Sequence, residues 1–323
     1  MTILLTGAAG FIGSHLTEHL LSLGHTLIGL DNFDDQYAPA IKEANLQLAR
    51  LHPSFHLVRG DVRDRPLLNR LFRHYPIEAV IHLAARTGVR ASVHEPGLCL
   101  DVNINGTLTL LEAMRAAGVG QLVLASSSSV YGDSDRLPFR EDDPADQPLS
   151  PYAQSKRAAE LLAHTYHHLY GFSVSCLRFF TVYGPRQRPE MAISQFTANL
   201  YRARPITLYG DGTTARNYTY IDDTVAGIRL ALDKPDGFRI LNIGGPSSVS
   251  LIQLVRLLEE TTGRPARIDW QAAQPGDVQY TAADLEQSFS TICYKPNVTI
   301  REGISQYITW FRSAVEPVRT EFP

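Results

Sequence analysis

The chain has 323 residues, of which 44% are hydrophobic and 20% charged, and its formal net charge is −3. This length and composition are typical of a globular protein with one large domain or two modest ones. The small net charge argues against nucleic acid or an anionic membrane as a partner, whereas a few local arginines suffice to bind an anionic small molecule.

The three cysteines, Cys99, Cys176 and Cys293, are far apart and form no CxxC pair. This pattern disfavours a zinc knuckle or a disulfide scaffold and suits a reducing cytosol. An apolar strand begins within two residues of Met1, which leaves no room for a signal peptide, and no apolar run approaches membrane-spanning length. We therefore expect a cytoplasmic protein without a metal site.

A glycine-rich turn comes after the first predicted strand, residues 3–5. It reads Thr6-Gly7-Ala8-Ala9-Gly10-Phe11-Ile12-Gly13, and apolar residues then recur at helical spacing up to Gly24. Glycines allow the backbone to approach a pyrophosphate, and the helix N-terminus offers free N–H groups and the positive end of a dipole. Strand-to-helix turns also use glycine for steric reasons alone, so the glycines by themselves are weak evidence for a bound cofactor.

The second strand, residues 26–30, ends in Asp31-Asn32. An acidic residue here accepts hydrogen bonds from an adenosine ribose and repels a 2′-phosphate, which favours NAD over NADP. The alternative is that Asp31 only caps a helix or turn.

Strands and helices alternate up to about residue 178, which predicts a doubly wound parallel sheet of the Rossmann type. Asp61 and Val62 come after the third strand and are placed to flank an adenine ring. Leu83, Ala84 and Ala85 end the fourth strand, where small side chains let a phosphate or ribose lie close. The remaining predicted strands of this half are residues 55–58, 79–85, 121–125 and 174–178, and its helices are residues 66–74, 101–117 and 151–169.

Arg86 and Arg90 lie in the loop just after the fourth strand. Open α/β sheets bind ligands at this edge, and arginine suits a phosphate or carboxylate. Either residue is equally well explained as a solvated surface charge.

A serine cluster, Ser126–Ser129, ends the fifth strand, and Ser150 is a good N-cap for the helix that carries Tyr152 and Lys156. Residues at i and i+4 share a helix face, so a phenol and an ammonium point to one region. A nearby cation and the helix dipole favour the phenolate, which makes the tyrosine a usable base. Chance alone often places a tyrosine four residues before a lysine, but together with the serines and the glycine turn the pattern predicts alcohol–ketone redox chemistry.

The same helix carries His164, His167 and His168 at spacings seen in metal sites. No acidic or cysteine partner pattern accompanies them, so an exposed or dimer-packing face is the favoured interpretation.

After residue 178 the pattern changes. We expect residues 1–178 to form the NAD-binding Rossmann domain and residues 179–323 to form mainly a smaller α/β lobe that binds the substrate, with residues 221–243 returning to the first domain. The predicted elements of this half are helices 193–203, 224–232, 251–262 and 300–311 and strands 206–209, 240–243 and 266–270.

Seven motifs together resemble the extended short-chain dehydrogenase/reductase family, specifically nucleotide-sugar epimerases: TGAAGFIG, LDN, RGDV, HLAA, SSSSVYG, PYAQSK and RFFTVYGP. The resemblance implies a recycled NAD, a UDP-sugar substrate and a homodimer formed through helices 101–117 and 151–169. It also implies that Ser127, Tyr152 and Lys156 are catalytic and that Phe180 contacts the cofactor. Ser128 and Ser129 are close enough in sequence to take the role of Ser127.

Two features bear on the sugar. Related 4,6-dehydratases place an acidic residue where this chain has Ser129, which disfavours dehydration. The run Arg188-Pro189-Glu190-Met191-Ala192 resembles the RPDMA of UDP-glucuronate 4-epimerases and departs from it at Glu190. We therefore expect interconversion of UDP-glucuronate and UDP-galacturonate. Because Arg186-Gln187 also resembles UDP-galactose 4-epimerases, interconversion of UDP-glucose and UDP-galactose is the alternative.

The implied mechanism is oxidation at C4, rotation of the 4-keto sugar and reduction on its other face. The substrate contacts implied by the resemblance are Arg90, Ser128, Ser129, Thr181, Arg188, Phe196, Thr207, Tyr209, Arg216 and Asp277. Asp277 equally fits a turn after a proline and a glycine. A net dehydrogenase would instead accumulate NADH, and an NAD-sensing regulatory protein would have no need of the serine, tyrosine and lysine together.

Overall fold

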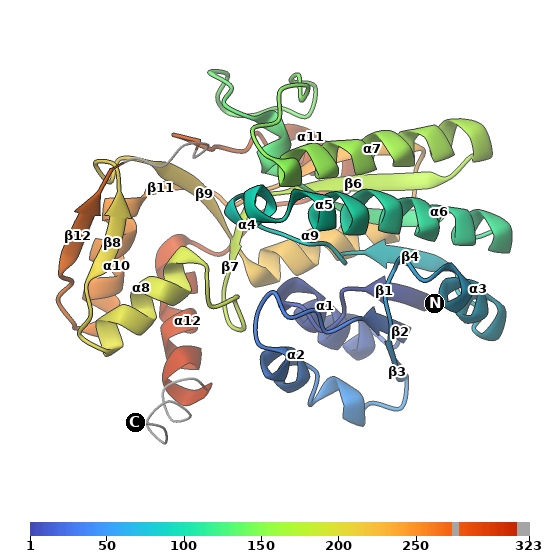
Figure 1. Cartoon of the computed structure of the whole chain (residues 1–323), viewed down its shortest axis with the longest axis horizontal. Coiled ribbons are helices and arrows are strands. Elements are labelled where there is room, and N and C mark those ends of the chain that lie inside the picture. The colour runs from blue at the N-terminus through green and yellow to red at the C-terminus, as the bar shows by residue number, and fades with distance from the viewer. Residues whose placement is uncertain (273–277, 315–323) are drawn as a thin grey trace.

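The computed structural model describes residues 1–272 and 278–314. Its centre is a seven-stranded, entirely parallel sheet with the strand order β10-β6-β5-β4-β1-β2-β3 (Figure 1). The predicted doubly wound Rossmann sheet is thus confirmed. The strands are β1 (Thr2–Thr6), β2 (Thr26–Asp31), β3 (Phe55–Arg59), β4 (Ala79–His82), β5 (Gln121–Ser127), β6 (Ser173–Phe179) and β10 (Phe238–Ile243).

Side chains alternate between two hydrophobic clusters, one on each face of the sheet. In β1, Ile3 and Leu5 contribute to one cluster and Leu4 to the other, and all three are fully buried. A strand covered on both faces is apolar at consecutive positions, which is why these strands read as continuous apolar runs.

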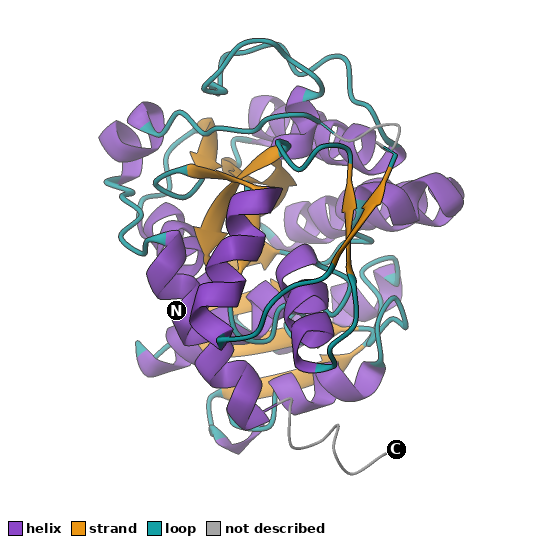
Figure 2. Ribbon diagram, turned by 90° about the vertical axis from the view of Figure 1, so that its left-hand side faces the viewer, coloured by secondary structure: helices purple, strands orange, loops and turns teal. Residues whose placement is uncertain are grey.

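Helices cover both faces of the sheet (Figure 2). On one side α3 (Arg65–His74), α6 (Gly106–Ala117) and α7 (Pro151–Tyr170) pack in a row, and on the other α1 (Phe11–Ser22) packs against α9 (Ile221–Asp233). The predicted start of α7 is confirmed, and the helix ends at Tyr170, one residue beyond the predicted end. The hydroxyl of Ser150 accepts a hydrogen bond from the backbone N–H of Ala153 (3.1 Å), and Gly171 adopts the left-handed conformation that ends the helix.

The second half of the chain adds two small sheets beside the carboxyl edge of the large one. One contains β7 (Thr181–Tyr183), β9 (Ala215–Tyr220) and β11 (Ser248–Ser250), and the other pairs β8 (Ile206–Tyr209) with β12 (Ile268–Gln271). Their helices are α8 (Ala192–Tyr201), α10 (Leu251–Thr262), α11 (Glu286–Ile292) and α12 (Ile300–Ala314). The chain also returns to the large sheet, because β10 pairs with β6 and α9 packs on α1.

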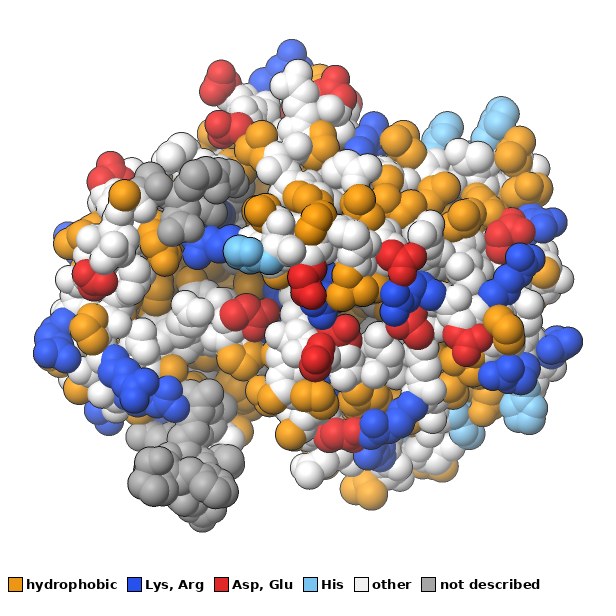
Figure 3. Space-filling view, viewed as in Figure 1, with side chains coloured by type: hydrophobic (Ala, Val, Ile, Leu, Met, Phe, Trp, Pro, Cys, Tyr) orange, Lys and Arg blue, Asp and Glu red, His pale blue; other side chains and the backbone are white. Residues whose placement is uncertain are grey.

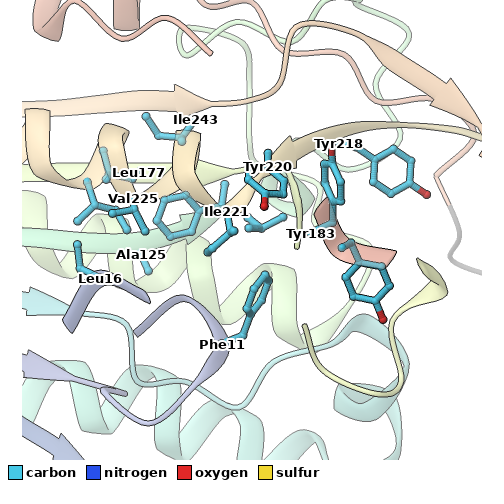
Figure 4. Close-up of a cluster of buried hydrophobic side chains, with 14 of the residues drawn as sticks. Phe11, Leu16, Ala125, Leu177, Tyr183, Tyr218, Tyr220, Ile221, Val225 and Ile243 are labelled. Carbon is cyan, nitrogen blue, oxygen red and sulfur yellow. The ribbon is translucent and has the colours of Figure 1, made fainter. Parts of the chain in front are cut away.

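A continuous hydrophobic cluster joins the large sheet to this second part (Figure 4). Ala125 and Leu177 of the large sheet lie at one end of it, and the tyrosine rings of β7 and β9 lie at the other. The ring of Tyr183 makes edge contacts with Tyr218 and Tyr220, at centroid distances of 5.9 and 5.5 Å. Packing of this kind fixes the second part over the carboxyl ends of the strands.

Several predicted boundaries were wrong. The predicted strand 79–85 is paired only as far as His82, because Leu83–Ala85 line a cavity instead of continuing the ladder. The predicted helix 101–117 is divided into a π-helical turn (Asp101–Asn105) and α6, and is preceded by α4 (Val89–His94) and α5 (Pro96–Leu100). In the described part of the chain no helix is long and apolar enough to cross a membrane.

Candidate active site

A cavity of about 470 Å³ lies along the carboxyl ends of the large sheet. Every residue that we predicted to contact the cofactor lines it, from the glycine turn to Phe180. So do Ser127, Ser128 and Ser129, together with Thr181, Arg188 and Arg216. The predicted cofactor-binding residues and the predicted catalytic residues therefore line one cavity. It lies at the edge where open α/β sheets bind ligands.

The glycine turn is too tight for side chains. A Cβ at Gly13 would lie 2.0 Å from the carbonyl oxygen of Gly7, and one at Gly7, where φ is +74°, would lie 2.8 Å from the backbone nitrogen of Ala84. Gly10 precedes the first residue of α1 and provides no side-chain cap. The N–H groups at the start of this helix are consequently free to bind an anion in the cavity.

Asp31, at the end of β2, is buried on the cavity wall. Its carboxylate accepts hydrogen bonds from the backbone N–H groups of Ala9 (3.0 Å) and Phe33 (2.8 Å), so it does brace the turn as well as face the cavity. Beside it, the amide of Asn32 donates to Asp61 at 3.0 Å. Both carboxylates line the cavity, and Asp61 is also paired with Arg63 at 2.8 Å.

Tyr152 lies in the first turn of α7, and Lys156 lies one turn further on. The lysine ammonium donates to the carbonyl oxygen of Ala125 at 2.8 Å and lies 6.0 Å from the centre of the Tyr152 ring. Ser127 lies near enough to Tyr152 to oppose the rise in its pKa, and its hydroxyl oxygen accepts a hydrogen bond from the Ser129 hydroxyl at 2.9 Å. Ser127 is thus the serine of the cluster that acts on the ionisation of Tyr152.

The electrostatics of this pair differ from our expectation. We expected Lys156 to lower the pKa of Tyr152, but burial raises the pKa of Tyr152 above its usual 10, and the opposing effects of Ser127 and Arg188 do not offset it. Burial also lowers the pKa of Lys156 to about 8, against the influence of Cys99 and Glu160. Both shifts arise because a charged group loses hydration inside the protein.

Arg188 reaches the cavity from the loop after β7. Its guanidinium donates to the hydroxyl of Thr87, forms an ion pair with Glu190 (3.1 Å) and contacts the sulfur of Met191 (3.5 Å). The contact with Thr87 connects this loop to the loop after β4.

Four described residues that we predicted to contact the substrate do not line the cavity: Arg90, Phe196, Thr207 and Tyr209. The guanidinium of Arg90 stacks on the ring of Tyr209 at 4.8 Å, and this contact links α4 to β8. Phe196 is buried in the hydrophobic core, and Thr207 is paired within the two-stranded sheet. Asp277 lies outside the described residues.

Sequence reasoning missed part of the cavity wall. The missed residues are Leu30, Asp34, Gln36, Tyr37, Lys42, Gly60, Arg86, Thr87, Gly88, Val89, Val102, Ala125, Ser126, Gly132, Phe179, Val182, Met191, Val278 and Thr281. Many come from irregular loops without periodicity, so no local signal marked them; Arg86 was noted as an anion-binding candidate but not assigned to the site. Within the described ranges, no group of histidine, cysteine, aspartate and glutamate is arranged to bind a metal ion. His167 instead bonds the carbonyl of Phe172 at 2.7 Å.

The sequence profile of the NAD-dependent epimerase/dehydratase family matches residues 3–244. The UDP-glucuronate 4-epimerase of Thermodesulfobacterium geofontis is 42% identical over 318 residues, which cover 98% of each chain. Among solved structures, the UDP-glucuronic acid 4-epimerase of Bacillus cereus, in complex with UDP-glucuronic acid and NAD, matches with a TM-score of 0.92 and 35% identity, covering 97% of this chain and 99% of that one. The UDP-glucose 4-epimerase of Thermotoga maritima with UDP-glucose matches with a TM-score of 0.90 and 31% identity, covering 98% and 100%.

Proposed function

Because the chain belongs to the NAD-dependent epimerase/dehydratase family, we propose that it inverts C4 of a UDP-sugar through a transient 4-keto intermediate. The substrate that we propose is UDP-glucuronate, which is named for its relatives in T. geofontis and B. cereus, and the product is the C4 epimer, UDP-galacturonate. The observation that carries the proposal is the placement of Ser127, Tyr152 and Lys156 in the same cavity as the glycine turn.

The cavity fits NAD. The uncapped start of α1 suits the pyrophosphate, and the buried Asp31 carboxylate suits a ribose diol and disfavours a 2′-phosphate. We propose that Asp61 and Val62, which follow β3, flank the adenine. Tyr152 and Lys156 line the same cavity beside β5, on the other side of β1 in the sheet. When bound, NAD supplies the acceptor and donor of a hydride for the sugar carbon.

The protein's own residues move the proton. Tyr152 takes the proton of the C4 hydroxyl during oxidation and returns it to the C4 oxygen after the sugar has presented its other face. Ser127, which lines the same cavity and acts on the pKa of Tyr152, is proposed to bond the same substrate oxygen. Lys156 provides a nearby cation that favours the phenolate form of the tyrosine.

The sugar carboxylate is assigned to the wall that Thr181, Arg188 and the serine cluster share. Arginine binds carboxylates through charge-assisted hydrogen bonds, and Arg188 lines the cavity close enough to Tyr152 to lower its pKa. Ser129 is uncharged, so it does not repel a carboxylate and cannot supply the acid that elimination of water requires.

A neutral UDP-sugar is the second candidate, favoured by the match to the T. maritima enzyme and by Arg186-Gln187. The test is to incubate the purified protein separately with UDP-glucuronate and UDP-glucose and to separate the products. We expect UDP-galacturonate from the first and at most slow turnover of the second. Turnover of UDP-glucose alone would refute the glucuronate assignment, and accumulation of NADH would indicate a net dehydrogenase.

We further propose that the protein is a cytoplasmic homodimer formed through α6 and α7. Apolar side chains gather on the surface over α7 (Figure 3). Leu161, Leu169 and Tyr170 of α7 are 53%, 60% and 48% exposed, and Leu108 of α6 is 38% exposed. An exposed apolar patch of this kind supports an interface with a second copy. Free cysteines, two of them buried, suit a reducing compartment.

A further inference from the structure

A third residue shares the face of α7 that carries Tyr152 and Lys156. Glu160 lies one turn beyond Lys156, and its side chain is only 1% exposed. It does not line the cavity, so it has no direct contact with a bound ligand. Its position nevertheless continues the i, i+4 spacing of the proposed catalytic pair.

The Glu160 carboxylate is fully engaged in hydrogen bonds. One oxygen accepts from the Ser126 hydroxyl (2.6 Å) and from Nε of Arg178 (2.9 Å), and the other accepts from Nη2 of Arg178 and from Arg157, both at 2.9 Å. Arg178 is itself 1% exposed and lies on β6, directly opposite Ser126 in the sheet.

Two consecutive residues of β5 are therefore hydrogen-bonded to one face of α7, and the third acts on the same face. The carbonyl of Ala125 accepts from Lys156, the hydroxyl of Ser126 donates to Glu160, and Ser127 lies near enough to Tyr152 to affect its pKa. Loss of the hydrogen bond from Ser126 would let the end of the strand move relative to the helix, and the residues on either side of Ser126 contact or act on the proposed proton-transfer group.

The buried charges also anchor the turn that comes after the serines. The Arg178 guanidinium stacks on the ring of Tyr131 at 4.6 Å, and Tyr131 donates its hydroxyl to Asn242 at 2.7 Å. A buried ion pair adds little net stability compared with a well-packed apolar pair, so its value here is the geometry that it imposes.

We propose that Glu160 is a positioning residue for the epimerisation, and that it acts through Ser126 by fixing the end of β5 against α7 so that Ser127 and Lys156 both face Tyr152. This inference rests on the proposed function.

Ser126→Ala is the most direct variant, because Glu160 keeps both arginines. Ser126 also lines the cavity, so the variant Glu160→Leu/Arg178→Met, which changes no cavity residue, is tested beside it. The groups that act on Tyr152 remain in the chain: Lys156 on its own helix, Ser127 on β5, Arg188 on the loop after β7 and Cys99 on α5. A change in the titration of Tyr152 would therefore report a change in distance and not a lost charge.

We expect Ser126→Ala to lower kcat by about 10- to 100-fold, because a displacement of an ångström or less is enough for such a loss. We expect KM to change less than about twofold and the pH at which Tyr152 ionises to rise. Ser126→Thr, which keeps the hydroxyl, should restore kcat. The double variant Glu160→Leu/Arg178→Met removes the tie without leaving a buried unpaired charge and should reproduce the loss.

Leu71→Ala, in the core of α3, is the control for a general loss of stability. It should lower the melting temperature without moving the ionisation of Tyr152. The inference is overturned if Ser126→Ala matches wild type in kcat and in Tyr152 ionisation, or if Leu71→Ala reproduces its effects.

A direct titration separates this inference from the proposed function. The difference in tyrosinate absorbance between a protein and its Tyr152→Phe counterpart tracks Tyr152 without any substrate. If wild type turns over neither UDP-sugar, the proposed function fails, and this titration in wild type and Ser126→Ala still tests the tie between strand and helix.

Discussion

We predict that Tyr152 and Lys156 titrate as a pair, because the state with one proton removed can place the charge on either residue. In this site burial raises the pKa of Tyr152 above 10 and lowers that of Lys156 to about 8. The first proton is therefore lost near pH 8, mainly from the ammonium. The reactive form pairs a Tyr152 phenolate with a Lys156 ammonium and contains the same number of protons. It forms from this state when the Tyr152 hydroxyl transfers its proton to the neutral Lys156 amine.

The pair predicts how activity depends on pH. The once-deprotonated pair is absent well below pH 8, so kcat should rise as the pH approaches about 8. In Lys156→Met only Tyr152 can lose the proton, so the rise should move to higher pH, and kcat at pH 7 should fall by about 100-fold or more. A pH profile of kcat for both proteins checks this. An unshifted rise in Lys156→Met would contradict the pairing.

Arg188 provides a test of the sugar assignment. In Arg188→Met the loss of a charged hydrogen bond of about 1.5–3 kcal/mol should raise KM for UDP-glucuronate by about 10- to 100-fold. Arg186→Met is the matched control, because Arg186 is paired with Glu18 at 2.8 Å and does not line the cavity. Steady-state kinetics of both variants decide the matter, and equal KM changes would argue against a carboxylate or phosphate contact at Arg188.

At the scale of elements, the strand–turn–helix unit at the start of the chain permits no side chain at Gly13. In Gly13→Ala the new Cβ would collide with the Gly7 carbonyl, so the turn must open and NAD content should fall sharply. Gly97→Ala, on α5, is the matched control, since nothing lies within 4 Å of its Cβ position. Cofactor content after purification and the melting temperature measure both effects. Full NAD content in Gly13→Ala would refute the predicted role of the turn.

His82 joins three elements through one hydrogen-bond chain. The Thr107 hydroxyl donates its hydrogen to the carbonyl of Asn103, so it accepts a hydrogen bond from Nε2 of His82. The Thr6 hydroxyl accepts from the backbone N–H of Ala84 and donates its own hydrogen to Nδ1 of His82. This pattern needs a neutral imidazole with its proton on Nε2. Burial correspondingly lowers the pKa of His82 from 6.5 to about 3.

The buried neutral histidine predicts acid instability. Below pH 6.5 the unfolded chain binds a proton at this histidine that the native protein does not bind, so stability falls as the pH drops from 6.5 toward 3. The expected cost is about 1.4 kcal/mol for each pH unit. His15, whose pKa is lowered to about 4, adds to the slope. Urea unfolding of wild type and His82→Gln between pH 7 and pH 4 isolates the His82 contribution. The same dependence of the unfolding free energy on pH in both proteins would contradict it.

At the scale of the whole molecule, the exposed apolar face of α7 predicts association. Leu161→Glu places a charge on that face and should shift the protein toward the monomer. Leu48→Glu is the control, because Leu48 is 68% exposed and lies outside α6 and α7. Light scattering after size exclusion distinguishes the two. A wild-type monomer, or a Leu161→Glu variant that remains dimeric, would contradict the proposed interface.

The elements that sequence analysis located well are those with local signals. The first strand, the glycine turn and α1 succeed each other within a few residues, and α7 has a serine cap and a glycine stop. In contrast, β9 and β11 pair with each other across more than two dozen residues, and β7 pairs with β9 across a helix and a further strand. Their stability comes from partners far away in the sequence, so no local pattern revealed them.

The same division applies to the site. The spacing of the glycines, Asp31, the serine cluster, Tyr152 and Lys156 indicated by itself the cofactor class and the kind of reaction, because each motif is local. Only the tertiary structure decided that Arg90 stacks on Tyr209 and that Phe196 is buried in the core. It also decided that Ser127 is the serine that acts on Tyr152, that burial raises the pKa of that tyrosine, and that Glu160 ties β5 to α7. These properties depend on burial and on distances between side chains that are remote in sequence, which no local pattern encodes.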